Sequence, residues 1–300
     1  MIDSDELDEK YSIEGEIGFS EMDGGLVFIT IANKYADAEI CLYGAQVISF
    51  TPLNRMDLLW LSPESRFEIG TPIRGGIPVC FPWFGPHKTD SEKPQHGFGR
   101  LMNWDVDQTA SLPNGETFIK LKLCSSDATK AYWPYDFCAE LTIVVGQKLS
   151  VALHVTNTSS EAFEYSSALH SYFGVSSIEN IAIEGLQNAK YHSQLEPGDF
   201  VQETPDLKIE KAETRHYYGT KSTCVISDPI FRRRVSIEKS GSTNTTVWNP
   251  GEEACLKIGD IPDDGYLTFV CLETVNAFDG SVKLNPQESH ETVAIIGLEE

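Results

Sequence analysis

The chain has 300 residues, of which 45 are Asp or Glu and 23 are Lys or Arg, so its formal net charge at pH 7 is −22. This charge argues against binding to nucleic acids or to anionic membranes, because both depend on cationic surface. No apolar run is long enough to cross a membrane, and no basic, apolar leader opens the chain. We therefore expect a cytoplasmic protein.

In chain order, residues 1–10 are predicted to form an acidic, mobile tail and residues 11–300 a single domain. Apolar and polar residues alternate in many short runs of this domain, which is typical of half-buried β-strands. Helices are expected only near 127–132 and 252–258. Strands are expected near 25–32, 36–50, 119–123, 138–145, 149–155, 163–173, 222–227, 232–239, 266–275 and 291–298. The pattern predicts an all-β fold, an antiparallel sandwich or barrel with few short helices.

The cysteines are scattered and contain no Cys-x-x-Cys spacing. An odd number of thiols, mostly on strand-like segments, predicts reduced and buried cysteines, as in a cytosolic protein. They are Cys41, Cys80, Cys124, Cys138, Cys224, Cys255 and Cys271.

The segment from Arg74 to Arg100 is the most informative part of the chain. Arg74-Gly-Gly-Ile-Pro-Val-Cys-Phe-Pro-Trp-Phe-Gly-Pro86 combines aromatic residues with glycines and prolines that break regular strand pairing. Gln95-His96-Gly-Phe-Gly-Arg100 adds a few polar groups. A few polar groups that converge on an aromatic surface are typical of a binding pocket, so the segment predicts a pocket for a sugar-sized ligand. The alternative is a buried crossover whose arginines pair with carboxylates, for example Arg100 with Asp105.

These two motifs resemble those of the hexose-6-phosphate mutarotases, the glucose-6-phosphate 1-epimerases within the larger aldose 1-epimerase group. Shorter motifs follow the same order and spacing, so the resemblance spans roughly residues 40–298: Tyr43-Gly-Ala-Gln-Val-Ile-Ser49, Leu169-His-Ser-Tyr-Phe173, Val247-Trp-Asn-Pro250 and Cys271-Leu-Glu273. The resemblance implies the large β-sandwich of the galactose mutarotase fold. It also implies an isomerase that interconverts the α and β anomers of hexose 6-phosphates, and we expect a monomer that binds a small-molecule sugar phosphate.

Two residues are candidates for acid–base chemistry. His170 shares a strand face with Tyr172, where a histidine is either a structural group or a catalyst. Glu273 ends an apolar strand, so it either caps an exposed end or lies in a poorly hydrated site, where it would accept a proton near neutral pH. Position by position, the resemblance implies that His170 and Glu273 are catalytic. One base and one acid suffice to open and reclose a cyclic hemiacetal, so no metal or cofactor is expected.

Arg74, Gln95, His96 and Arg100 are the candidate substrate-binding residues. Arginine suits a phosphate because its planar guanidinium group donates two parallel, charge-assisted hydrogen bonds. Gln95 and His96 offer donors and acceptors for sugar hydroxyls. The resemblance implies that both arginines and Gln95 contact the substrate.

The chain departs from the family at one point. Family members commonly carry an aspartate shortly before a tyrosine, where this chain reads Ala212-Glu-Thr-Arg-His-Tyr217. Either Glu213 or Thr214 takes that position, which leaves the sugar specificity open. The remaining histidines show no metal-ligand spacing. Two other functions stay open: an epimerase for unphosphorylated aldoses, and a non-catalytic protein that binds sugar phosphates.

Overall fold

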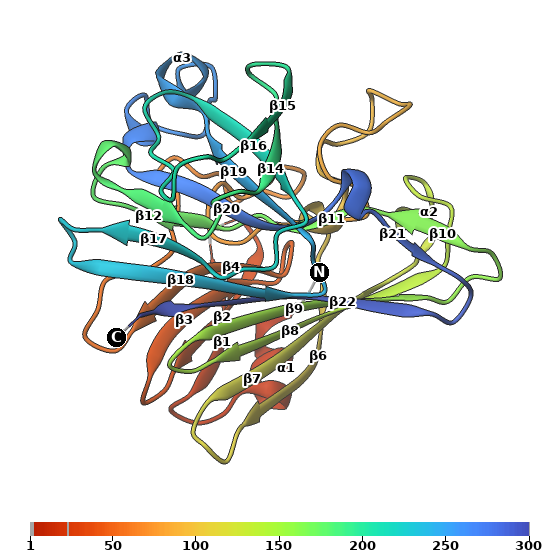
Figure 1. Cartoon of the computed structure of the whole chain (residues 1–300). Helices are drawn as coiled ribbons and strands as arrows, with labels where there is room; N and C mark the ends of the chain where they lie inside the picture. The colour runs from red at the N-terminus through yellow and green to blue at the C-terminus, as the bar shows by residue number, and fades with distance from the viewer. Residues whose placement is uncertain (1–2, 23, 300) are drawn as a thin grey trace.

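Antiparallel β-sheets dominate the structure, a computed structural model that describes residues 3–22 and 24–299 (Figure 1). The first two residues of the predicted tail lie outside this part. One sheet contains β1 (Ile17–Met22), β2 (Leu26–Ala32), β3 (Ala36–Cys41) and β4 (Gln46–Pro52), in this order, and a short ribbon pairs β10 (Phe163–Tyr165) with β21 (Val282–Leu284).

Two larger sheets lie one above the other in Figure 1. We call them the upper and the lower sheet. The upper sheet runs through β15 (Gly198–Val201), β14 (Lys190–Ser193), β16 (Glu213–Tyr218), β19 (Asn244–Asn249), β20 (Phe269–Asn276), β11 (Ser167–Leu169) and β5 (Val79–Cys80), and β12 (Tyr172–Gly174) also pairs with β20. The lower sheet runs through β13 (Ala182–Glu184), β17 (Cys224–Asp228), β18 (Arg233–Ser240), β22 (Ser289–Leu298), β9 (Leu149–Asn157), β8 (Phe137–Val145), β7 (Thr117–Cys124) and β6 (Asp105–Ser111).

The alternation seen in the sequence produces the core of the lower sheet. In β8 every second residue is buried, from Phe137 to Val145. In β9 the apolar set is buried in the same way, and Leu149 and Val151 are completely inaccessible to solvent. A period of two places these side chains on one face, and their removal from water stabilises the packed sheets. The predicted all-β sandwich is confirmed.

Helices are short in the described residues. The two expected helices are present as α2 (Asp127–Lys130) and α3 (Gly251–Cys255), and single 3-10 turns occur at η1 (Gly99–Leu101), η2 (Ile178–Asn180), η3 (Gly265–Leu267) and η4 (Phe278–Gly280). The sequence analysis missed α1 (Ser4–Tyr11), which occupies most of the predicted tail.

Helix α1 has the end signals of an ordinary helix. The Asp3 side chain accepts a hydrogen bond from the backbone N–H of Asp5 at 3.0 Å and so caps the N-terminus. The Asp8 carboxylate accepts from the backbone N–H of Phe19, and the Tyr11 carbonyl accepts from the Thr109 hydroxyl, so the helix is attached to the sheets. Its apolar side chains are too few to give a helical period, which explains why the pattern was missed.

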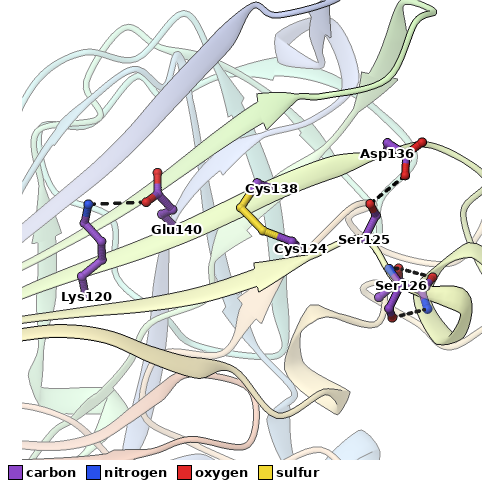
Figure 2. The surroundings of a disulfide bond; sticks show 8 residues. Lys120, Cys124, Ser125, Ser126, Asp136, Cys138 and Glu140 are labelled. Carbon is purple, nitrogen blue, oxygen red and sulfur yellow. Dashed lines mark hydrogen bonds and ion pairs between the residues drawn. A yellow bond between two sulfur atoms is a disulfide. The ribbon is translucent and has the colours of Figure 1, made fainter. Parts of the chain in front are cut away.

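One prediction about the cysteines is wrong. Cys124 and Cys138 form a disulfide, whereas all cysteines were predicted to be reduced (Figure 2). The two residues lie directly opposite each other on the antiparallel strands β7 and β8. Their register brings the sulfur atoms together, and a separation of 14 residues along the chain does not reveal it. The other five cysteines are buried and free.

We predict that the disulfide stabilises the fold. The double substitution Cys124→Ser/Cys138→Ser should lower the free energy of unfolding under oxidising conditions by about 2–3 kcal/mol, because it releases a closed loop in the unfolded chain. Urea unfolding measures the change. A reductant should bring the wild type to the level of the variant and leave the variant unaffected. Peptide mapping that finds both thiols free in the oxidised protein would contradict the assignment.

Candidate active site

A cavity of about 340 Å³ on the upper sheet brings together all six residues singled out from the sequence. They come from distant segments of the chain. The loops between β4 and β6 supply four of them, the connection between β11 and β12 supplies the fifth, and β20 supplies the sixth. In that order they are Arg74, Gln95, His96, Arg100, His170 and Glu273.

Glycine allows the loop with Gln95 and His96 to approach the pocket. Gly97 has φ 75°, and a Cβ there would lie 2.1 Å from the Phe81 carbonyl oxygen, so only glycine fits. His96 has φ 66°, which is uncommon for a residue with a side chain. Its backbone N–H donates to the Gly85 carbonyl at 2.7 Å, and the Gly85 N–H donates to His96 Nδ1 at 3.1 Å. Since Nδ1 accepts, the neutral ring carries its proton on Nε2.

His170 and Glu273 form a buried pair. His170 Nε2 lies 3.4 Å from Glu273 Oε1, and the two residues are only 7% and 2% exposed. Burial is the main reason that the pKa of His170 falls to about 3, and Arg100 and Arg74 lower it further. Burial raises the pKa of Glu273 well above its usual value. Glu273 therefore lies in a poorly hydrated site, not at an exposed strand end, and burial disfavours the charged form of both residues.

Arg74 is partly engaged within the protein. Its Nε donates to Asp260 Oδ1 at 3.0 Å and its Nη1 to the Tyr172 hydroxyl at 3.1 Å. Burial alone would lower the pKa of Arg74, but Tyr172 and Asp260 raise it overall. The alternative prediction of carboxylate pairing thus holds for Arg74. Its second terminal nitrogen has no protein hydrogen-bond partner in the described residues.

Arg100 is different, because no carboxylate of the described residues lies within ion-pairing distance of it. Its Nη2 donates to the Gln95 carbonyl at 2.9 Å, while its Nε is buried without a partner. The proposed pair with Asp105 is absent from this part of the chain. Burial lowers the pKa of Arg100, and the charge of Arg74 adds to this effect. A half-buried cation without a counter-charge is unfavourable, so the pocket favours an anion.

Strand β16 forms a neutral wall of the cavity. Thr214 and His216, which alternate along the strand, line the pocket. Glu213 does not line it and instead pairs with Arg215, with 2.6 Å between Oε2 and Nε. Of the two residues that could replace the usual aspartate of the family, Thr214 is therefore the one that faces the pocket.

Other lining residues were not among the six predicted site residues, although Phe84 belongs to the aromatic surface expected from the long motif. Phe84, Tyr172 and Trp248 form aromatic walls, and Gln194 and Thr246 add polar groups. Alternation along β19 places Thr246 and Trp248 on the same face, which is a signal that the sequence contains. The order of the strands in the sheet, which brings β16 and β19 beside Glu273, is not visible in it.

A larger hollow of about 550 Å³ lies beside the turn that leads into β18. Two of the arginines that line it are bonded within the protein. Arg233 donates to the backbone carbonyls of Asp57 and Gly174, and Arg234 pairs with two glutamates. Across residues 3–22 and 24–299, no cluster of three or more His, Cys, Asp or Glu could hold a metal ion. No helix in the same ranges is long and apolar enough to span a membrane.

Comparison with known proteins agrees with the motifs. The family described as "Aldose 1-epimerase" matches residues 28–296. Two proteins named "Putative glucose-6-phosphate 1-epimerase" are similar over most of the chain. The one from Salmonella typhimurium is 35% identical and the match covers 84% of each chain, and the one from Escherichia coli is 33% identical with 88% of each chain covered.

Solved structures share the fold. The crystal structure of "a putative mutarotase" from Salmonella typhimurium superposes with a TM-score of 0.90 at 29% identity, covering 97% of this chain and 96% of that one. A galactose mutarotase-like protein from Lactobacillus casei has a TM-score of 0.74 at 16% identity, with 91% and 100% covered, and shares the fold alone. Because the family match and the two relatives cover nearly the whole chain, this protein belongs to the aldose 1-epimerase family.

Proposed function

We propose that this protein interconverts the α and β anomers of hexose 6-phosphates, as a glucose-6-phosphate 1-epimerase. The observation that carries the proposal is the position of Arg100, a cation without a carboxylate partner in the described residues, beside the buried pair of His170 and Glu273. Arg100 and Arg74 would hold the phosphate, and Gln95 and His96 would bind ring hydroxyls. The names of the relatives from Salmonella typhimurium and Escherichia coli support this substrate.

The phosphate would also set the protonation state of the catalytic pair. Burial lowers the pKa of His170, and the charges of Arg100 and Arg74 lower it further. A bound phosphate dianion offsets their charges, which removes part of the force that lowers the pKa of His170. The proton held by Glu273 can then pass to His170 across the 3.4 Å contact. The bound state would contain an imidazolium acid and a carboxylate base.

The reaction follows from this pair. Glu273 takes the proton of the anomeric hydroxyl while His170 gives its proton to the ring oxygen, so that the bond between C1 and the ring oxygen breaks and the aldehyde forms. The open chain rotates about the bond between C1 and C2. On reclosure the hydroxyl that attacks C1 returns its proton to His170, and Glu273 returns a proton to the new anomeric oxygen. The enzyme ends in its starting state.

We also propose that the protein acts as a monomer in the cytoplasm, and that residues 11–300 work as one domain. The cavity is lined by side chains of one chain, so a partner subunit is not needed to complete it. An epimerase for free aldoses remains the second candidate, and the pairing of Arg74 with Asp260 is the observation that favours it.

The first functional prediction concerns acid–base chemistry. His170→Asn and Glu273→Gln keep the approximate shape of each side chain but remove the proton transfer, so each should lower kcat by roughly a hundredfold or more with a modest change in KM. Anomer-exchange NMR with glucose 6-phosphate gives both constants. His154→Asn, a change on the lower sheet, is the matched control. Exchange at the wild-type rate in either variant would show that the residue has no catalytic role.

The second prediction concerns the phosphate. Arg100→Met and Arg74→Met keep most of the apolar stem and should raise KM for glucose 6-phosphate by a factor that corresponds to about 2–4 kcal/mol, with much less effect on glucose. Arg100→Lys should recover only part of the lost affinity, because an ammonium group cannot form the two parallel hydrogen bonds of a guanidinium group. Arg234→Met, at a surface ion pair, is the control. Equal effects on both sugars would favour the free-aldose epimerase.

A further inference from the structure

Three residues on neighbouring strands form a row along the pocket. His216 on β16 lies opposite Thr246 on β19, and Thr246 lies opposite Glu273 on β20. All three line the cavity. Residues that face each other on antiparallel strands have Cβ atoms about 4.5–5.5 Å apart, so each member of the row is the immediate neighbour of the next. The row extends the catalytic pair by two polar side chains that the reaction does not use.

The two added residues are joined by a hydrogen bond. His216 Nδ1 and Thr246 Oγ1 are 2.8 Å apart, and the residues are only 3% and 2% exposed. Burial lowers the pKa of His216 to about 4, so the ring is neutral at physiological pH. Phe84 and Phe278 pack against the ring, with centroids 6.0 and 4.6 Å away. His216 is therefore a fixed, uncharged group that holds the Thr246 hydroxyl in one direction.

The Thr246 hydroxyl retains bonding capacity toward the pocket. A hydroxyl offers one donor and two acceptor positions, and the bond with His216 uses one of them. This is the only hydrogen bond of Thr246 Oγ1 in the described part of the chain. A neutral hydroxyl next to a catalytic carboxyl group suits a second, vicinal hydroxyl of the same sugar.

We propose that Thr246 binds the hydroxyl on C2 of the sugar and that His216 is the positioning residue that orients it. The inference rests on the proposed function, in which Glu273 acts on the anomeric hydroxyl at C1. Since Thr246 is the direct neighbour of Glu273 in the row, its hydroxyl lies beside the next carbon of the ring. Thr246 and His216 thus form a neutral part of the wall, which recognises a hydroxyl group by a hydrogen bond.

The test uses Thr246→Val, which removes the hydroxyl and keeps the shape, and His216→Phe, which removes the orienting group. Each should raise KM for glucose 6-phosphate about 5–10-fold and change kcat less than about twofold, because a neutral hydrogen bond is lost equally from substrate and transition state. The double variant should be no worse than either single one, since the two act as a unit. Thr246→Ser and His216→Asn retain the required groups and should recover most of the affinity.

The substrate 2-deoxyglucose 6-phosphate supplies the decisive comparison. On this sugar Thr246→Val and the wild type should have the same KM, because the hydroxyl that Thr246 binds is missing. Thr142→Val, on the outer face of β8, is the control threonine and should match the wild type on both sugars.

Each result has a defined meaning. A KM increase of equal size on both sugars, or multiplicative effects in the double variant, would overturn the inference. Unchanged KM in Thr246→Val would do so as well, even if His216→Phe fails to fold. Failure of the proposed function is distinguishable, because the wild type would then exchange the anomers of neither sugar phosphate.

Discussion

Arg100 carries a charge at the wall of a small pocket, with its Nε buried and no carboxylate of the described residues close enough to pair with it. A half-buried charge without a counter-charge is unfavourable, and an anion in the pocket would offset it. Burial is the main reason that the pKa of His170 is low, and the charges of Arg100 and Arg74 lower it further. In the proposed function, phosphate binding and proton transfer are therefore linked through one electrostatic interaction, although the net charge of −22 repels an anionic ligand at long range.

The upper sheet supplies the geometry that this interaction needs. Strand β20 is buried along its whole length, so Glu273 lies in a dry environment that raises its pKa. Register then places neighbours beside it: Thr246 on one side, and His170 from the connection between β11 and β12 on the other. A one-residue shift of β16 would exchange Thr214 for Glu213 and put a carboxylate into the pocket. The register of this strand therefore keeps its wall of the pocket uncharged.

Sequence patterns predicted most strands of the lower sheet, where apolar and polar residues alternate clearly, and the long Gly/Pro/Trp motif pointed to the pocket. The patterns missed β14, β16 and β19 of the upper sheet, which lie outside the predicted runs. The pairing of strands that are distant in the sequence could not be predicted from such local signals. Cys124 and Cys138 meet only through the register of β7 and β8, and His216 reaches Glu273 only through the order of β16, β19 and β20. The N-terminal helix was missed although Asp3 is a good cap residue, since its apolar side chains give no clear period. Only the structure shows which of the two arginines pairs with a carboxylate: Arg74 pairs with Asp260.

The most direct test of the account is anomer-exchange NMR of the wild type with glucose 6-phosphate and with glucose, at equal enzyme and substrate concentrations. If the two arginines select a phosphate, kcat/KM should be greater for the phosphorylated sugar by about 30-fold or more, which corresponds to at least about 2 kcal/mol of differential binding. Equal efficiency on the two sugars would contradict the account and assign the pocket to free aldoses.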